Sequence, residues 1–187
     1  MKKVLSLVMA LALTLSVFTA CGNKNTAATT TPVETTAAAV ATVEGTMEEL
    51  LNQIVTENPV EFMGGVIPVD LTDTSEDGLW AIRSYTGLED AASLTEAAVF
   101  EPMMGSLAFS MVLVRVAPEA DAKAVAEAMK SGIDTRKWIC VEANELLVAG
   151  IGDVVMLIML DSQTGLTAQS FVDAFAKVAG AEPSFTI

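Results

Sequence analysis

Two stretches of the chain, 107–116 and 154–160, are apolar at almost every position. A strand that is covered on both faces shows this pattern, because neither of its alternating sides meets water. The sequence between and after them predicts a helix at 119–132, strands at 138–143 and 146–149, and a final helix at 167–180. We expect this β-α-β-β-β-α run to form the core.

Capping residues mark the ends of three predicted helices. Thr46 and Glu49 have capping-box spacing, and apolar positions then follow at helical intervals, so the first helix is expected over 46–57. Gly132 and Gly180 are expected to end the two later helices in the left-handed conformation, which glycine adopts most easily.

The segment between the first helix and residue 107 has a weaker pattern. The elements predicted there are short strands at 66–71 and 79–85 around a turn at 73–78, a helical turn at 88–94, and a strand at 96–103. The whole pattern predicts an α+β fold, a mostly antiparallel sheet of about five to seven strands with two to three packed helices. A single folded domain is expected over 46–181, followed by a frayed tail at 182–187.

The start of the chain has the plan of an export signal. After a basic beginning, an apolar run over 4–17 is too short to be a stable membrane span. The small residue Ala20 then precedes Cys21, which resembles a bacterial lipoprotein signal, although Phe18 stands where Leu is more usual. We therefore expect residues 1–20 to be removed and Cys21 to carry lipid. The alternative is a plain signal peptide with an incidental cysteine.

Residues 21–45 are expected to form a disordered tether between the lipid and the domain. They are rich in Thr and Ala and show neither helical nor strand periodicity, so they cannot bury enough apolar surface to offset their ordering entropy. This organisation predicts a protein at the cell membrane, anchored by its lipid and facing outside the cytoplasm.

Charge and composition exclude several classes of function. The formal net charge is -14 at pH 7, which opposes binding to nucleic acid or to an anionic bilayer and leaves the lipid on Cys21 as the membrane attachment. The chain has no histidine, so His-dependent triads and zinc sites are excluded. Cys140 has apolar neighbours and is expected to be a buried core thiol without a disulfide partner. No catalytic residue and no cofactor are predicted.

One acidic stretch contains part of a calcium motif. Asp73, Ser75 and Asp77 occupy positions one, three and five of a calcium-binding loop, and Gly78 follows them. The twelfth position, where a bidentate Glu closes such a loop, is Ser84. A turn between two strands accounts for the same residues, and no other metal site is predicted.

Two adjacent cations are unusual in so acidic a domain. Arg136 and Lys137 precede Trp138 at the point where a helix is expected to lead into a strand. One interpretation is a contact site for an anion or a protein partner, with Trp138 as its anchor. The other interpretation is structural, with the cations at the carbonyl end of the helix and Trp138 filling the edge of the core.

One segment resembles a known protein family. Asp134-Thr-Arg-Lys-Trp-Ile-Cys-Val141, together with the export signal and the Thr-rich tether, is similar to a family of small bacterial lipoproteins of Gram-positive type that carry a domain of unknown function. The resemblance covers Thr46 to Gly180 and departs at Thr135, where Pro is usual. It implies a surface-anchored α+β domain and carries no activity and no site residues.

Two classes of function remain. The first is a non-catalytic binding or accessory module of the cell envelope, which docks another envelope protein or associates with itself. The tether and the lack of a catalytic constellation favour this class. The alternative is a small-ligand receptor or a cryptic hydrolase, which a deep pocket with convergent polar groups would favour.

Overall fold

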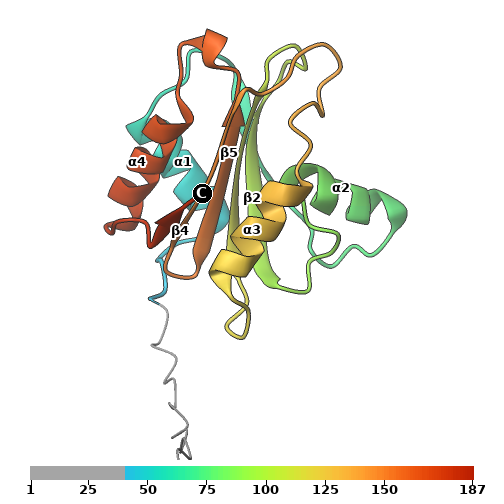
Figure 1. The fold of residues 1–187 in the computed structure, drawn as a ribbon, viewed down its shortest axis with the longest axis vertical. Coiled ribbons are helices and arrows are strands. Elements are labelled where there is room, and N and C mark those ends of the chain that lie inside the picture. Colours follow the sequence, from blue (N-terminus) through green and yellow to red (C-terminus); the bar gives the residue numbers. More distant parts are fainter. Residues whose placement is uncertain (1–40) are drawn as a thin grey trace, which may run out of the picture. The chain divides into compact units, whose positions relative to one another are not determined.

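Residues 41–187 are described by the computed structural model and contain six strands and four α-helices (Figure 1). The predicted signal with Ala20 and Cys21, and the predicted tether up to residue 40, lie outside the described residues. The elements are α1 (Met47–Glu57), β1 (Gly64–Pro68), α2 (Glu76–Thr86), β2 (Leu94–Pro102), β3 (Phe109–Val116), α3 (Ala122–Gly132), β4 (Glu145–Ile151), β5 (Val154–Leu160), the 3-10 helix η1 (Ser162–Thr164), α4 (Ala168–Ala179) and β6 (Phe185–Thr186).

The strands form one antiparallel sheet in the order β1-β2-β3-β5-β4-β6. Helices α1 and α4 cover one face, and α2 and α3 cover the other (Figure 1). The predicted α+β class and mostly antiparallel sheet are confirmed, and the order of elements in the C-terminal half is consistent with the predicted run apart from the strand expected at 138–143. Within residues 41–187, no helix has the length and apolar character that crossing a bilayer requires.

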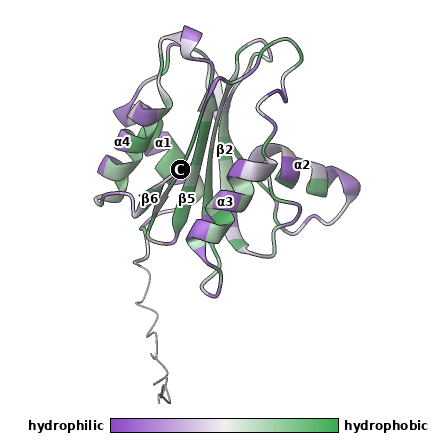
Figure 2. Cartoon of the chain, in the orientation of Figure 1, coloured by the Kyte–Doolittle hydropathy of each residue, from purple (hydrophilic) through white to green (hydrophobic). Residues whose placement is uncertain are grey.

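The central strands are apolar on both sides because each face of the sheet has its own core. Along β5, Val154, Met156 and Ile158 belong to the cluster under α1 and α4, whereas Val155 and Leu157 belong to the cluster under α2 and α3. Figure 2 shows the hydrophobic residues concentrated on the strands and on parts of the helices that face them. The prediction that this segment is covered on both sides is therefore confirmed.

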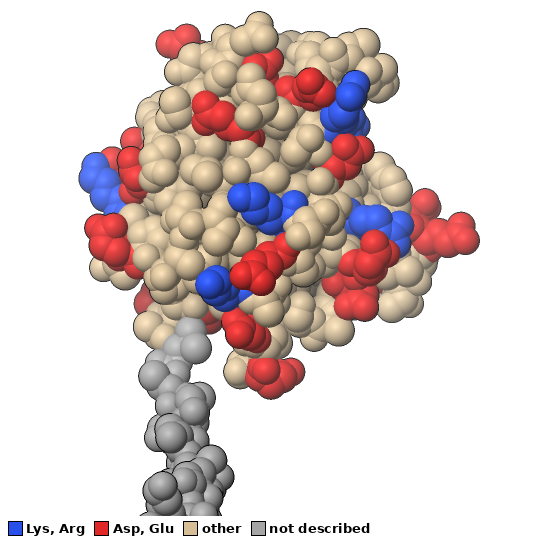
Figure 3. Space-filling model, viewed as in Figure 1, with Lys and Arg blue, Asp and Glu red and all other residues tan. Residues whose placement is uncertain are grey.

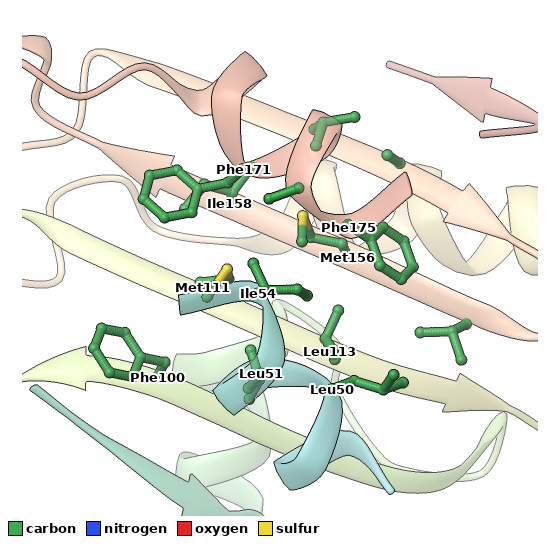
Figure 4. Packing of buried hydrophobic residues seen from close by; sticks show 14 of the residues in the cluster. Leu50, Leu51, Ile54, Phe100, Met111, Leu113, Met156, Ile158, Phe171 and Phe175 are labelled. Atoms are coloured by element: carbon green, nitrogen blue, oxygen red, sulfur yellow. The ribbon is translucent and has the colours of Figure 1, made fainter. Parts of the chain in front are cut away.

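Helices α1 and α4 supply large apolar side chains to the core on their own face of the sheet. Leu50, Leu51 and Ile54 of α1 lie over the sheet, as do Phe171 and Phe175 of α4 (Figure 4). Each of these side chains is at most 2% exposed. Burying one contributes roughly 1.5–3 kcal/mol, so this packing holds both helices on the sheet.

Two of the three predicted helix ends are confirmed. Thr46 and Glu49 form the capping box, with the Glu49 amide donating to Thr46 Oγ1 at 3.2 Å and the Thr46 amide donating to Glu49 Oε2 at 3.0 Å. Gly180 ends α4 in the left-handed conformation, with φ 67°. The prediction for Gly132 is wrong, because it is the last residue of α3 and the cap is Ile133 with φ -71°.

Gly132 is required by close packing instead. A Cβ atom at Gly132 would lie 2.0 Å from the carbonyl oxygen of Gly87, which itself ends α2 with φ 78°. Both contacting groups are backbone, so neither can yield without moving its helix. This contact lets the ends of α2 and α3 meet.

The predicted strand at 79–85 is wrong, because the segment lies in α2. Ser75 is the N-cap, and its hydroxyl accepts a hydrogen bond from the Gly78 amide at 3.2 Å. Gly78, Ile82 and Thr86 then follow one turn apart and are the buried residues of the helix. Only this narrow stripe is buried, so the short segment lacks a clear helical pattern of apolar residues.

Neighbouring boundaries need smaller corrections. The predicted strands at 66–71 and 96–103 correspond to β1 and β2, with ends shifted by one to three residues. The predicted helical turn at 88–94 is irregular, and a hydrogen bond from the Leu94 amide to the Ala91 carbonyl leads directly into β2.

The predicted strand at 138–143 is wrong, because the segment is a loop between α3 and β4. The Ala143 amide donates to the Thr135 carbonyl at 2.9 Å, which closes the loop on itself. Ile139 is 98% exposed, and Cys140 is exposed rather than buried in the core. The alternating apolar pattern does not make this segment a strand, because β5 and β6 already pair with the two sides of β4 and leave no place for it there.

The predicted frayed tail at 182–187 is also wrong. Strand β6 begins at Phe185 and pairs with β4, and Ile187 exchanges two backbone hydrogen bonds with Val148. The Phe185 ring packs against Gly150, where a Cβ atom would come within 2.2 Å of it. The missing side chain at Gly150 thus makes room for the ring that fixes the tail.

The last residues of the predicted tether are fixed to the sheet. The Arg115 guanidinium donates to the carbonyl oxygens of Val43 at 3.1 Å and Gly45 at 2.6 Å, and it pairs with Asp153 at 2.6 Å. Asp153 also accepts a hydrogen bond from the Val43 amide at 2.8 Å. We call Arg115, Asp153 and residues 41–45 the clamp. The folded unit therefore begins at about residue 41 rather than at 46.

The clamp lies at one end of the sheet. Strand β5 begins there at Val154 and ends at Leu160, roughly 20 Å away at the usual rise per residue. The loops at the opposite end include 58–63, 103–108 and 161–167, and we call these three loops the far end.

Candidate functional site

Lys137 points into the protein, and its side chain is only 11% exposed. The ammonium donates to Glu101 Oε1 at 2.5 Å, to the Ser110 hydroxyl at 3.1 Å and to the Ser84 carbonyl oxygen at 3.2 Å. An ammonium has three N–H donors, so all of them are used. We call Lys137, Glu101, Ser110 and Ser84 the lysine site.

Two aromatic rings complete the surroundings of this ammonium. Its nitrogen lies 5.1 Å from the centroid of Tyr85 and 5.4 Å from that of Trp138, which is the range of cation–π contacts. Both rings also pack against the core under α2 and α3. The charge of Lys137 is therefore held between a carboxylate and two aromatic faces.

Four elements bring the lysine site together. Ser84 lies in the last turn of α2, Glu101 near the end of β2 and Ser110 near the start of β3, while Lys137 follows α3 in the loop. The contact between Gly87 and Gly132 places the start of that loop against α2. The site consequently joins segments that are far apart in the sequence.

Burial shifts two pKa values in the lysine site. It lowers the pKa of Lys137 below its ordinary value, and the Glu101 carboxylate opposes that shift. It raises the pKa of Tyr85, and the charge of Glu101 adds to this effect. Tyr85 therefore stays a neutral phenol at physiological pH.

A lysine beside a serine hydroxyl suggests nucleophilic catalysis, because such pairs activate serine in some hydrolases. Here Ser110 is fully buried, so its hydroxyl cannot reach a substrate. Lys137 also donates to that hydroxyl and is paired with Glu101, whereas a general base must accept the proton of the serine. The geometry suits a polar connection between α2, the sheet and the loop better than this chemistry.

A small hollow adjoins the lysine site. Its volume is about 300 Å³, at the lower limit for ligand pockets. Trp80 stands at its side and is 63% exposed, while Arg83 is paired with Glu89 at 2.8 Å. The lining residues are Trp80, Arg83, Ser84, Gly132, Asp134 and Lys137.

The structure separates the three residues predicted as an anion or partner contact. Lys137 faces inward, and Trp138 packs against the core under α2 and α3, as the structural interpretation expects. The carbonyl that Lys137 meets is that of Ser84 in α2, however, and not one of the preceding helix α3. Arg136 remains at the surface, paired with Glu142 at 3.2 Å. A contact with an anion or partner stays a prediction, now resting on Arg136.

The residues predicted as a half calcium loop lie at the start of α2. The Asp73 carboxylate accepts a hydrogen bond from the Ser75 amide at 2.9 Å, and hydrogen bonding to Ser75 lowers the pKa of Asp73. Asp77 lies in the first turn, where a negative charge suits the helix dipole. Capping thus accounts for these side chains. In the part of the chain that the structure describes, no three acidic or cysteine side chains are grouped as a metal site.

Sequence reasoning missed a hollow at the far end. Its volume is about 560 Å³, and Phe62, Met104, Leu107 and Leu166 supply its apolar lining beside the carboxylate of Glu61. The apolar residues that line this hollow lie in loops, where they follow neither a helical nor a strand period. The sequence therefore gives no pattern that predicts it. The full lining is Pro59, Glu61, Phe62, Met104, Leu107, Thr164, Gly165 and Leu166.

No family model matches this chain, and neither a curated protein nor a solved structure shows significant similarity to it. The resemblance to lipoproteins with a domain of unknown function therefore stays a prediction. Function has to be argued from the residues and their geometry.

Proposed function

We propose that this protein is a membrane-anchored extracytoplasmic lipoprotein whose folded domain is a non-catalytic binding or accessory module of the cell envelope. The observation that carries the proposal is the separation between the clamp and the far-end hollow, which lie at opposite ends of the sheet. The chain that leads to Cys21 joins the domain at the clamp. A domain held at that end offers the other end to a partner.

The far-end hollow suits an apolar side chain of a protein partner. Met104 lines it and is 55% exposed, and methionine adapts readily to different apolar shapes. Glu61 at the rim favours a partner with a basic group beside its apolar anchor. Figure 3 shows acidic and basic side chains scattered over one face, and the chain has 24 acidic residues against 10 basic ones, which agrees with a basic partner.

Anchoring is tested with the full chain expressed in a bacterium. An alkyne-tagged fatty acid should label the wild-type protein, and the labelled protein should sediment with membranes. Replacing Cys21 with alanine should abolish both results. Cys140→Ser is the matched control and should change neither, because Cys140 is an exposed thiol of the folded domain. Membrane-bound, labelled Cys21→Ala protein would refute the anchoring proposal.

Partner binding is tested by placing a photo-crosslinking amino acid at Met104 in the anchored protein. The control position is Gln53, which is exposed on α1. One dominant protein should be captured from position 104 and not from position 53, and Leu166→Glu should remove it, because a charge enters the hollow. The same captured proteins at both positions would contradict the binding role of the far end.

A small-ligand receptor is the second candidate, because the volume of the hollow falls within the usual range of ligand pockets. Native mass spectrometry of protein purified from cells distinguishes the two. A stoichiometric small molecule that Leu166→Glu removes would favour the receptor. Ligand-free protein that still captures its partner would favour the binding module.

A further inference from the structure

Strand β1 is an edge of the sheet, and half of its backbone groups point away from β2. Hydrogen bonds from the Met103 amide to the Met63 carbonyl and from the Val69 amide to the Ala97 carbonyl fix which residues face β2. Hydrogen-bonded pairs alternate along an antiparallel ladder, so the odd-numbered residues from Met63 to Val69 bond to β2. Gly64 and Val66 lie between them and direct their N–H and C=O groups away from β2. Within residues 41–187 these outward groups have no hydrogen-bond partner.

This edge lacks most of the features that keep edges apart. Residues 62–69 contain no charged side chain, although the protein as a whole carries a net charge of -14. Met63 is 73% exposed and Ile67 is 45% exposed, and both lie on the α2 side of the sheet. Pro68 is the one residue of β1 that opposes pairing, because it has no amide hydrogen to donate.

We infer that two copies of this chain pair through β1, antiparallel and about a two-fold axis at Gly65. In this register Gly64 faces Val66 of the second copy, so the outward groups of both residues form four hydrogen bonds. Ile67 faces Met63 of the second copy on both sides of the axis. The exposed side chains of Ile67 in β1 and Met63 just before it thus cover each other.

Neighbouring registers fit the strand less well. A pairing centred on Val66 sets Pro68 against the carbonyl of Gly64, which then receives no donor, and a pairing centred on Gly64 sets Ile67 against Glu61. Gly65 suits the axis because facing residues are closest at a pair without hydrogen bonds, about 4.5 Å between Cα atoms. A Cβ atom at Gly65 would meet only the end of Met103, at 3.9 Å, so the backbone there is open.

Charge favours a second copy at this edge rather than elsewhere. Two strongly acidic molecules repel each other over most of their surfaces, and the uncharged segment 62–69 is a place where they can approach. On the α2 side of β1 and β2, the nearest charged side chain is that of Glu101, which lies opposite Gly65. Lys137 neutralises this charge. The pairing is short, so it is weak in dilute solution. If the chain is anchored as proposed above, the membrane raises the local concentration. Antiparallel pairing directs the two clamps in opposite directions along the strands, so both predicted tethers reach the membrane when the strands of the pair lie along it.

Disulfide formation in the full chain tests the register. Gly65→Cys is made in a Cys140→Ser background, and the background chain alone measures any contribution of Cys21. Cysteines that face each other at position 65 would have the Cα separation that a disulfide needs, so mild oxidation of intact cells should yield a covalent dimer that a reductant separates. Ile67→Cys is the matched control, because its two copies would lie roughly 13 Å apart across the axis and cannot join.

A second variant tests the hydrogen bonds. Val66→Pro removes an outward amide that has no partner within the domain, and it should abolish the Gly65→Cys dimer. Val66→Ala removes the side chain and keeps the amide, so the dimer should persist; circular dichroism checks that both variants fold. Equal crosslinking of Gly65→Cys and Ile67→Cys, a Gly65→Cys chain that stays monomeric, or one that joins a different protein would each overturn the inference.

Discussion

Replacing Lys137 with methionine would test whether the lysine site holds the α2 side of the domain together. Methionine keeps much of the apolar stem but removes all three donated hydrogen bonds. The change leaves Glu101 without its counter-ion, with a side chain that is 20% exposed. It also leaves the buried Ser110 hydroxyl without the lysine.

We expect this variant to lose about 3 kcal/mol of unfolding free energy. A hydrogen bond to a charged group contributes about 1.5–3 kcal/mol, and an unsatisfied buried polar group costs about 1–3 kcal/mol. Because Glu101 is partly exposed, water recovers some of its solvation, which keeps the total below the full sum. Adding Glu101→Leu removes the unpaired charge, so the double variant should regain about 1 kcal/mol or more.

Urea unfolding followed by tryptophan fluorescence measures these differences, because Trp138 lies beside the ammonium. The single variants Lys137→Met and Glu101→Leu complete a double-mutant cycle. A Lys137→Met protein within about 0.5 kcal/mol of wild type would show that the site is not structural. Losses that simply add would show that the two charges do not stabilise each other.

Three further predictions concern other groups. Burial lowers the pKa of Lys137 from its ordinary 10.5, so just below pH 10.5 the unfolded chain binds more protons than the folded chain. The free energy of unfolding of the wild type should therefore rise with pH in this range relative to that of Lys137→Met, as measured by urea titrations at several pH values. Arg115→Met should cost about 2 kcal/mol by loss of charged hydrogen bonds and should expose residues 41–45 to proteases, read by limited proteolysis. Gly132→Ala should lower stability by about 2 kcal/mol in thermal unfolding, whereas Gly105→Ala, with open space around it, should change little; equal effects would contradict the packing argument.

The sequence predicts an element well when the element's own residues determine its structure, and poorly when distant parts of the fold do. The strand at 154–160 was predictable because its own residues are apolar on both faces. The loop at 138–143 has a strand-like pattern too, but whether it joins the sheet depends on the places beside β4, which β5 and β6 occupy. That competition is a property of the whole fold and cannot be found in a local window.

The candidate site shows the same limit. The sequence singles out Lys137 as a cation in an acidic domain, but it cannot say that the side chain points inward. Its direction depends on Glu101, which is 36 positions away, and on Ser110 in the next strand. Only the register of β2 and β3 brings those two residues together. The far-end hollow was missed for a related reason, since its lining comes from three loops.

The clamp also decides how the domain responds to tension. A load applied through the chain before Ala41 reaches Arg115 and Asp153 first. Arg115 belongs to β3, which is paired on both sides, so the load enters an interior strand rather than an edge. The side-chain contacts of the clamp yield before that strand can be peeled from its neighbours. Tension on the chain before Ala41 would therefore release residues 41–45 while the opposite end of the sheet keeps its shape.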